Sequence, residues 1–319
     1  MSERMIDRRA LLAGGVAGAM AGPGLVASAM GTGVLRPERD AVRKRVLRVA
    51  HITDPHVNAE KGSDRGLAQC LAHIQSQADR VDLIANTGDT VMCVNAVDEA
   101  SAAHQWNTVR AVFKDCSLPM LHCIGNHDLW GWKPDGSDPR RATGWALDAL
   151  GMPSRYFHDT RFDRSGWSFI SLDGICGSYT GKLDDEQFAF LERTLAALPA
   201  DRFVCILTHI PIISACGFFD GERFKNGQWT MPGSWMHEDA ARLKDLFAKH
   251  RNVKLCLSGH MHQLDRIEFQ GVTYLCSGAV SASWWGGKYY DCDYGYSIID
   301  LFDDGSLSYA YTTYGWKTV

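Results

Sequence analysis

Short apolar runs recur along this chain, separated by stretches with helical periodicity. Six runs have the length and composition of buried strands: residues 46–53 (VLRVAHIT), 82–87 (DLIANT), 120–125 (MLHCIG), 167–173 (WSFISLD), 203–209 (FVCILTH) and 253–259 (VKLCLSG). Residues 183–198 and 237–250 repeat apolar side chains at helical spacing. From Asp265 onwards the pattern is typical of hairpins, with turns expected at 269–271 and 303–306. We therefore predict an α/β fold with a β-rich C-terminal section.

Polar side chains suited to catalysis follow five of these runs directly. They are Asp54 and His56; Asp89; Asn126, His127 and Asp128; His209; and His260 and His262. In open α/β sheets, ligands bind where the loops at the carboxyl ends of the strands converge. Glycine precedes three of the clusters, at Gly88, Gly125 and Gly259, where the backbone is expected to turn tightly or to approach a ligand closely.

Each cluster also has a simpler interpretation. A single histidine after a strand is often a solvated loop residue, and Asp-Pro-His and Gly-Asp are common in turns. The whole set is harder to explain in this way, because two aspartates, one asparagine and four histidines occupy equivalent positions. Mixed imidazole and carboxylate donors favour Zn²⁺, Mn²⁺ or iron. Seven donors exceed the needs of one tetrahedral ion, so they predict two ions with a shared carboxylate, an arrangement that serves displacement at phosphorus.

The motifs DPH, GD, GNHD, TH and GHMH, in this order and with these gaps, resemble the calcineurin-like metallophosphoesterase family over residues 46–264. The resemblance implies a four-layer α-β-β-α sandwich with a dinuclear centre of Mn, Fe or Zn along one edge. It also implies a ligand set for each ion. Asp54, His56 and His262 hold the first ion, Asn126, His209 and His260 hold the second, and Asp89 bridges them.

The same resemblance gives His127 the role of the acid that protonates the leaving oxygen, while Asp128 orients its ring. The implied reaction is hydrolysis of a phosphate mono- or diester by metal-activated hydroxide that attacks phosphorus in line. The alternative is a catalytically silent, extracytoplasmic metal-binding protein of the same fold. His127 argues against it, because a binding protein needs no proton donor beside the ions.

One position separates branches of this family. Met92 lies where purple acid phosphatases carry the tyrosine that ligates ferric iron, so we expect no ferric-tyrosinate centre. The chain length and the helical stretch over 181–198 look more like the bacterial cyclic-nucleotide phosphodiesterases.

The first 29 residues have the layout of an export signal. A basic start that ends in Arg8-Arg9 precedes an apolar stretch and the small residues Ala27-Ser28-Ala29. The paired arginines resemble a twin-arginine signal. A membrane anchor is the alternative, but five glycines and Pro23 make a poor spanning helix. We predict a signal peptide at 1–29, a linker at 30–45, a single domain at 46–319 and a periplasmic or otherwise exported protein.

Charge and composition limit the partners. The net charge of −4 provides no basic surface for nucleic acid, so a small phosphate ester is the expected substrate, and membrane contact is expected only through the signal. None of the ten cysteines forms a Cys-x-x-Cys pair, which argues against a zinc knuckle. Tryptophans in the loops after His127 and His209, and at positions 284 and 285, either stack on a ring of the substrate or cover the edge of the sandwich.

Overall fold

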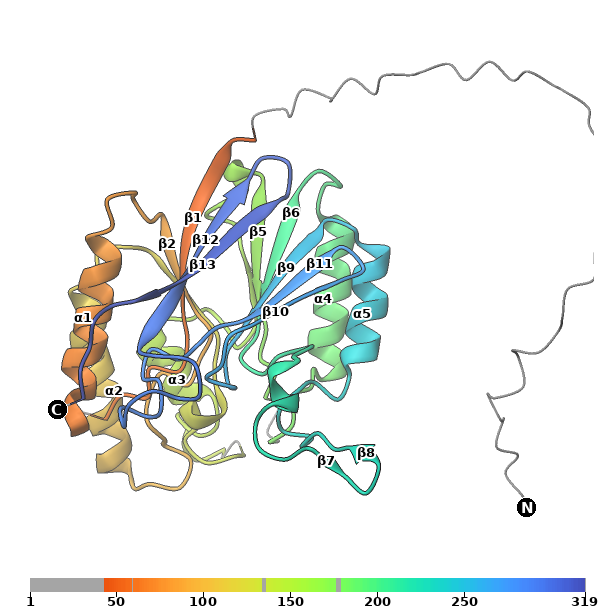
Figure 1. The fold of residues 1–319 in the computed structure, drawn as a ribbon. Helices are drawn as coiled ribbons and strands as arrows, with labels where there is room; N and C mark the ends of the chain where they lie inside the picture. Colours follow the sequence, from red (N-terminus) through yellow and green to blue (C-terminus); the bar gives the residue numbers. More distant parts are fainter. Residues whose placement is uncertain (1–42, 59, 134–135, 176–178, 319) are drawn as a thin grey trace, which may run out of the picture. The chain divides into compact units, whose positions relative to one another are not determined.

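The computed structural model describes residues 43–58, 60–133, 136–175 and 179–318. The expected export signal and most of the expected linker lie outside these residues. Two β-sheets face each other in the described part (Figure 1). The first sheet has the order β13 (Leu307–Thr313), β12 (Gly295–Phe302), β1 (Arg45–Ile52), β2 (Leu83–Asn86), β3 (Met120–His122). The second has the order β10 (Asp265–Phe269), β11 (Val272–Cys276), β9 (Val253–Ser258), β6 (Phe203–Leu207), β5 (Trp167–Ser171), β4 (Phe157–Asp159).

The layer between the two sheets is the central core of the sandwich. Strand periodicity places alternate side chains on this layer, for example Leu47 and Val49 of β1 opposite Cys205 and Leu207 of β6. These four side chains are at most 7% exposed. Because both inner faces are continuous and apolar, burial of this layer holds the sheets together.

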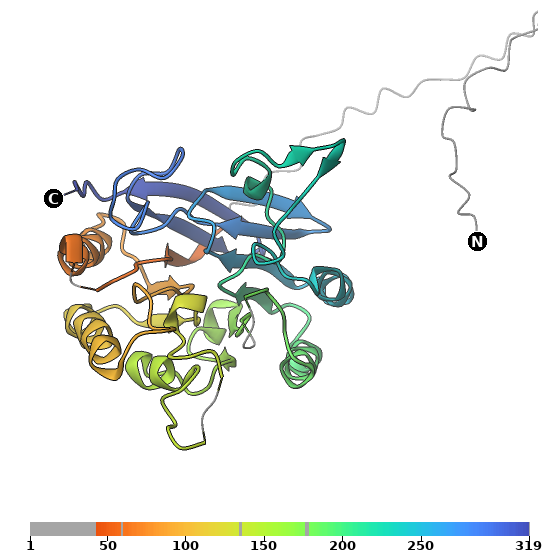
Figure 2. The same ribbon diagram turned by 90° about the horizontal axis from the view of Figure 1, so that it is seen from below.

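Helices cover both outer faces of the sandwich (Figures 1 and 2). On the first sheet lie α1 (Ser63–Gln75), α2 (Glu99–Lys114) and α3 (Gly144–Leu150); on the second lie α4 (Asp185–Ala197) and α5 (Ala240–Lys249). The helical period of α4 buries Phe188, Leu191 and Leu195 against the second sheet. Its first turn is capped by Asp184, whose side chain accepts a hydrogen bond of 2.8 Å from the Gln187 amide. The predicted α-β-β-α architecture is therefore confirmed.

Most predicted elements have the expected type. All six apolar runs form strands, and the two C-terminal hairpins turn at 270–271 and 303–306, between β10 and β11 and between β12 and β13. The sequence interpretation did not single out α1, α2, α3, the short edge strand β4, or the hairpin of β7 (Phe224–Lys225) and β8 (Gln228–Trp229). That hairpin extends from the second sheet after His209 (Figure 1).

Strand direction brings the five polar clusters to one edge. Strands β1, β2 and β3 are parallel in the first sheet, and β6 and β9 are parallel in the second. Each of these strands ends just before one cluster, so the loops that follow converge on the same edge of the sandwich.

Among the described residues, no helix combines the length and the apolar character needed to cross a bilayer. All nine cysteines in this part of the chain are unpaired, and Cys123, Cys205, Cys256 and Cys276 are buried, as their apolar surroundings predict.

Candidate metal centre

The backbone is strained where the polar clusters follow the strands. Five of the seven predicted ligands have a positive φ: Asp54 (51°), His56 (46°), Asp89 (50°), His260 (68°) and His262 (55°). Non-glycine residues rarely adopt this left-handed conformation, which costs on the order of 1–3 kcal/mol each and persists where the surroundings enforce it. Such strain, gathered at one edge of the sandwich, marks that edge as a candidate functional site.

Two glycines allow the loops to approach the aspartates. A Cβ atom on Gly125 would lie 2.1 Å from the Asp89 amide nitrogen and 2.2 Å from its Oδ1. A Cβ atom on Gly259 would lie 2.4 Å from Asp54 Oδ2 and 1.7 Å from Thr53 Oγ1. Both contacts are far shorter than van der Waals distances, so a side chain at either position would collide with the loop that carries the aspartate.

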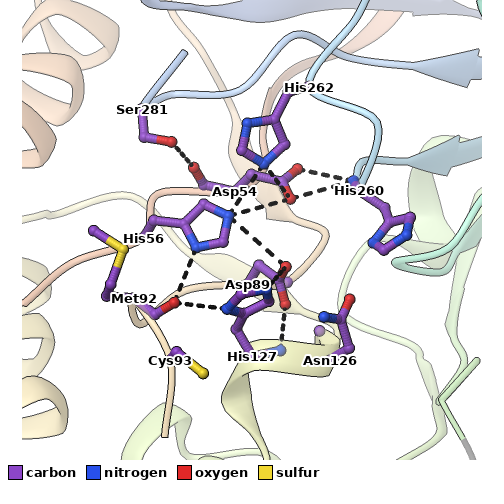
Figure 3. Close-up of polar contacts among 12 residues, drawn as sticks. Asp54, His56, Asp89, Met92, Cys93, Asn126, His127, His260, His262 and Ser281 are labelled. Carbon is purple, nitrogen blue, oxygen red and sulfur yellow. Dashed lines mark hydrogen bonds and ion pairs between the residues drawn. The ribbon is translucent and has the colours of Figure 1, made fainter. Parts of the chain in front are cut away.

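The first group of donors consists of Asp54, His56 and His262, all buried (Figure 3). Asp54 Oδ1 lies 3.3 Å from His262 Nε2 and 3.8 Å from His56 Nε2. The two imidazole Nε2 atoms are 3.1 Å apart. Three donor atoms that face one another at this spacing can share a metal ion.

The second group consists of Asp89, Asn126, His209 and His260. His209 Nε2 lies 3.2 Å from Asp89 Oδ2, 3.2 Å from Asn126 Oδ1 and 3.3 Å from His260 Nδ1. Asp89 Oδ2 is also 3.8 Å from His56 Nε2 of the first group. Asp89 therefore lies between the two groups, where a carboxylate that joins two ions has to be.

Backbone carbonyls fix the orientation of four imidazoles. The Nδ1–H groups of His209 and His262 donate to the carbonyls of Thr87 (2.8 Å) and Ala282 (2.7 Å). The Met92 carbonyl accepts from Nδ1 of both His56 (3.3 Å) and His127 (2.7 Å). A carbonyl only accepts, so the proton is on Nδ1 and Nε2 is left free to face the site. These carbonyls had no signal in the sequence.

The charges of the two buried aspartates are offset by histidine rings. In the described residues, the ion pairs of Asp54 and Asp89 are all with histidines. Burial opposes ionisation of Asp89, but His209 and His127 hold its pKa well below the usual value. Burial likewise lowers the pKa of His209, but the Asp89 carboxylate raises it to about 9. Two buried carboxylates thus draw protons onto the neighbouring rings, and the same site fits divalent cations.

His127 lies at the accessible side of the site. Its side chain is 29% exposed, and its Nε2 is 3.9 Å from Asp89 Oδ2. Its ring meets that of His56 edge to face at 4.9 Å. Burial lowers the pKa of His127, but Asp89 and the Cys93 thiol raise it to about 10. The exposed part of this ring is available to a bound ester.

The prediction that Asp128 orients the His127 ring is wrong. The Asp128 carboxylate is buried and accepts hydrogen bonds from the backbone amides of Thr90 (2.8 Å), Val91 (3.1 Å) and Gly125 (2.9 Å). The Met92 carbonyl orients the ring instead. Asp128 therefore joins the loop after β2 to the loop after β3, and it acts on the site only through the positions of those loops.

The structure brings all seven predicted ligands and His127 together. With this geometry established, comparison with known proteins identifies the family. The sequence profile of the calcineurin-like phosphoesterases matches residues 47–264. The chain belongs to this family. The phosphoesterase fold, the donor groups and the related enzymes together make it a metal-dependent phosphoesterase.

Several known proteins resemble this phosphoesterase over most of their length. The 3',5'-cyclic adenosine monophosphate phosphodiesterase CpdA of Escherichia coli strain K12 is 28% identical over 235 residues, which cover 70% of this chain and 73% of the relative. CpdA of Haemophilus influenzae is 24% identical over 280 residues, which cover 83% and 89%. A dimetal phosphatase from Danio rerio has the same fold, with a TM-score of 0.59, 13% identity, and coverage of 85% of this chain and 100% of that one.

Proposed function

We propose that this phosphoesterase hydrolyses small phosphodiesters with two transition-metal ions, Mn, Fe or Zn. The observation that carries the proposal is the position of Asp89. Its Oδ2 atom lies 3.2 Å from His209 Nε2 and 3.8 Å from His56 Nε2, between two groups of donors that each combine residues from both sheets. Imidazole and carboxylate donors in these numbers suit the proposed ions.

Each side chain has a defined task in this proposal. Asp54, His56 and His262 would hold one ion, Asn126, His209 and His260 the other, and Asp89 both. Two such ions supply Lewis acidity and a nucleophile derived from water near neutral pH. The chain itself orients His56, His209 and His262 through the carbonyls that accept from their Nδ1–H groups.

His127 is the proposed general acid. The hydrogen bond from its Nδ1–H to the Met92 carbonyl leaves Nε2 as the atom that gains and loses a proton. Nε2 faces the site and is accessible, so it can pass this proton to the leaving oxygen of a bound ester. General acid catalysis of this kind typically contributes roughly 10²–10⁴-fold.

The preference for diesters rests on the relatives. Both CpdA proteins are named as phosphodiesterases of 3',5'-cyclic adenosine monophosphate. The net charge of −4 makes a long polyanion an unfavourable substrate, so we propose a small diester.

The first test measures metal content and turnover together. Protein loaded with Mn²⁺ or Zn²⁺ is expected to hold two ions per chain and to hydrolyse bis(p-nitrophenyl) phosphate faster than p-nitrophenyl phosphate. Asp89→Asn is expected to lose bound metal and most of its activity, because the bridging charge is removed. Two tightly bound ions without turnover of either ester would favour the catalytically silent alternative.

We also propose that residues 1–29 direct export through the twin-arginine route. Support comes from Arg8-Arg9, the apolar stretch and the small residues that end at Ala29. Expression in a bacterial host is expected to yield periplasmic protein that begins at Met30. Replacement of both arginines by lysine is expected to retain the full-length chain in the cytoplasm. Equal export of the two forms would contradict this proposal.

A further inference from the structure

Residues 281–290, which we call the aromatic segment, are built directly against the metal centre. The Ser281 hydroxyl donates to the Asp54 carbonyl (2.7 Å), and the Ala282 carbonyl accepts from His262 Nδ1 (2.7 Å). Trp285 is fully buried, and its indole N–H contacts the carbonyls of Pro55 and His56, both at 3.0 Å. These contacts fix the backbone of the aromatic segment relative to the first group of donors.

Trp284 differs from its neighbour Trp285. Its side chain is 36% exposed, although its ring lies on the imidazoles of the centre, with centroids 4.3 Å from His262 at 33° and 5.7 Å from His56 at 46°. Its φ is 47°, a left-handed conformation that is rare for so large a residue. The chain therefore holds an indole at the metal centre at the cost of backbone strain, while leaving part of the ring in contact with solvent.

Tyr289 adds a second aromatic surface at a right angle to the first. Its ring meets Trp284 at 5.7 Å and 88°, and His262 at 5.7 Å and 66°. The hydroxyls of Tyr289 and Tyr290 donate to the two oxygens of Asp220, at 3.2 and 3.0 Å. Asp220 lies in the connection that leads to the β7–β8 hairpin, so the corner formed by Trp284 and Tyr289 is anchored from two parts of the chain.

Two other tryptophans near the motifs have different surroundings. Trp130 is 5% exposed and packs in the core with Trp145. Trp229 is 58% exposed, and its ring contacts Phe218 and Phe224 of the hairpin region. Trp284 combines substantial exposure with direct contact to two predicted metal ligands.

We propose that Trp284, with Tyr289 as a perpendicular wall, forms a subsite that binds a planar ring of the organic group of the phosphodiester, such as a nucleobase. The proposal deepens the proposed function and rests on it. A base stacks well on an indole because both have extended π faces, and such stacking changes affinity by about 5- to 150-fold. The alternative is a purely structural role, in which Trp284 only shields the imidazoles of His56 and His262 from water.

Adenosine 5'-monophosphate and ribose 5-phosphate form a matched pair of ligands, because they share the phosphate and the sugar and differ in the base. Calorimetric titration of the metal-loaded chain is expected to give at least tenfold tighter binding of adenosine 5'-monophosphate. Trp284→Leu keeps an apolar side chain but removes the π face. It is expected to reduce this ratio to about twofold or less while metal content stays at the wild-type value.

Trp229→Leu is the matched control, since it removes an exposed tryptophan outside the site, and it is expected to keep the wild-type ratio. The subsite is rejected if wild type binds the two ligands equally or binds neither at millimolar concentration. It is also rejected if Trp284→Leu weakens both ligands alike or loses metal. Turnover of bis(p-nitrophenyl) phosphate by wild type is measured in parallel. Base-dependent binding without turnover would refute the proposed function and leave the subsite standing.

Discussion

Single hydrogen bonds decide how the donors of this centre are presented. The Met92 carbonyl accepts from the Nδ1–H groups of His56 and His127, so one backbone atom orients a predicted ligand and the proposed acid together. The sequence interpretation assigned the second task to Asp128, because a carboxylate next to a histidine is its common partner. The structure shows that adjacency in sequence misled here, since the Asp128 carboxylate turns away to three backbone amides.

The His127 proposal predicts a dependence on the leaving group. His127→Ala is expected to retain two metal ions, because His127 lies outside the proposed ligand sets. Its kcat is expected to fall by about 10²–10⁴-fold for a cyclic nucleotide, whose leaving alkoxide needs a proton. The loss is expected to be much smaller for bis(p-nitrophenyl) phosphate, because its leaving group, p-nitrophenolate, is a stable anion. Parent turnover of the cyclic nucleotide by this variant would eliminate the acid role.

A second prediction concerns the substitution of Gly125 by alanine, which adds a single carbon atom. Gly125→Ala would place a Cβ atom 2.2 Å from Asp89 Oδ1, so the Asp89 carboxylate has to move. We expect loss of at least half of the bound metal and a fall in kcat of tenfold or more. Gly136→Ala is the control, because a Cβ atom there meets nothing within 4 Å. Similar metal content and kcat in the two variants would show that the close approach has no functional consequence.

Among the secondary-structure elements, the sequence predicted the strands that are buried on both faces of their sheet. The strands β1, β6 and β9 lie inside their sheets, so apolar residues predominate in their sequences. The helix α2 was not singled out, because a polar residue occupies its buried face. Gln105 is 8% exposed there and exchanges two hydrogen bonds of 3.0 Å with the Cys93 backbone. A buried polar side chain with a specific partner interrupts the apolar period without weakening the helix.

The features of the site that depend on particular side chains were also easier to predict than those that depend on the backbone. The convergence of the seven predicted ligands and His127 on one edge was predictable, because the proposed chemistry needs particular side chains at strand ends. The carbonyls of Thr87, Met92 and Ala282 were not, because any residue supplies a carbonyl. The aromatic corner also required the fold, since nothing in the sequence separates exposed Trp284 from buried Trp285.

The contact between α1 and the aromatic segment gives a prediction for an element. Gly66 of α1 faces Trp285, and a Cβ atom there would lie 2.1 Å from the indole ring. Helix propensity alone favours Ala over Gly by about 1 kcal/mol. Overpacking a core typically costs 1–3 kcal/mol, and here the backbone near Asp54 and His56 would move with Trp285. We therefore expect Gly66→Ala to lower both the free energy of unfolding and the metal content.

A substitution in the same helix isolates the propensity term. Ala68 is exposed, so Ala68→Gly is expected to reduce the free energy of unfolding by about 1 kcal/mol and to leave metal content unchanged. Denaturant unfolding and metal analysis of both variants separate the two effects. If Gly66→Ala stabilised the protein and kept its full metal content, the prediction would be wrong. The Trp285 ring could then shift without disturbing the backbone near Asp54 and His56.

For the molecule as a whole, the predicted metal ligands come from both sheets at one edge. Asp54, Asp89 and Asn126 follow strands of the first sheet, and His209 and His260 follow strands of the second. Ions bound between them would link loops that the inter-sheet core alone does not tie, and ligands that bind only the folded state stabilise it. At a metal concentration about 1,000 times the Kd, this stabilisation is about 4 kcal/mol. For a chain of this size, it corresponds to roughly 10 °C in Tm.

Removal of the metal by a chelator is therefore expected to lower Tm by roughly 10 °C, and excess Mn²⁺ or Zn²⁺ is expected to restore it. Asp89→Asn is the matched control, because it lacks the bridging charge and should melt at nearly the same temperature with and without chelator. Thermal scans of the two proteins, each with and without chelator, give the four values needed. An equal change in Tm in both proteins would mean that the stabilising metal binds elsewhere. No change in Tm in wild type would mean that bound ions do not stabilise this edge of the sandwich.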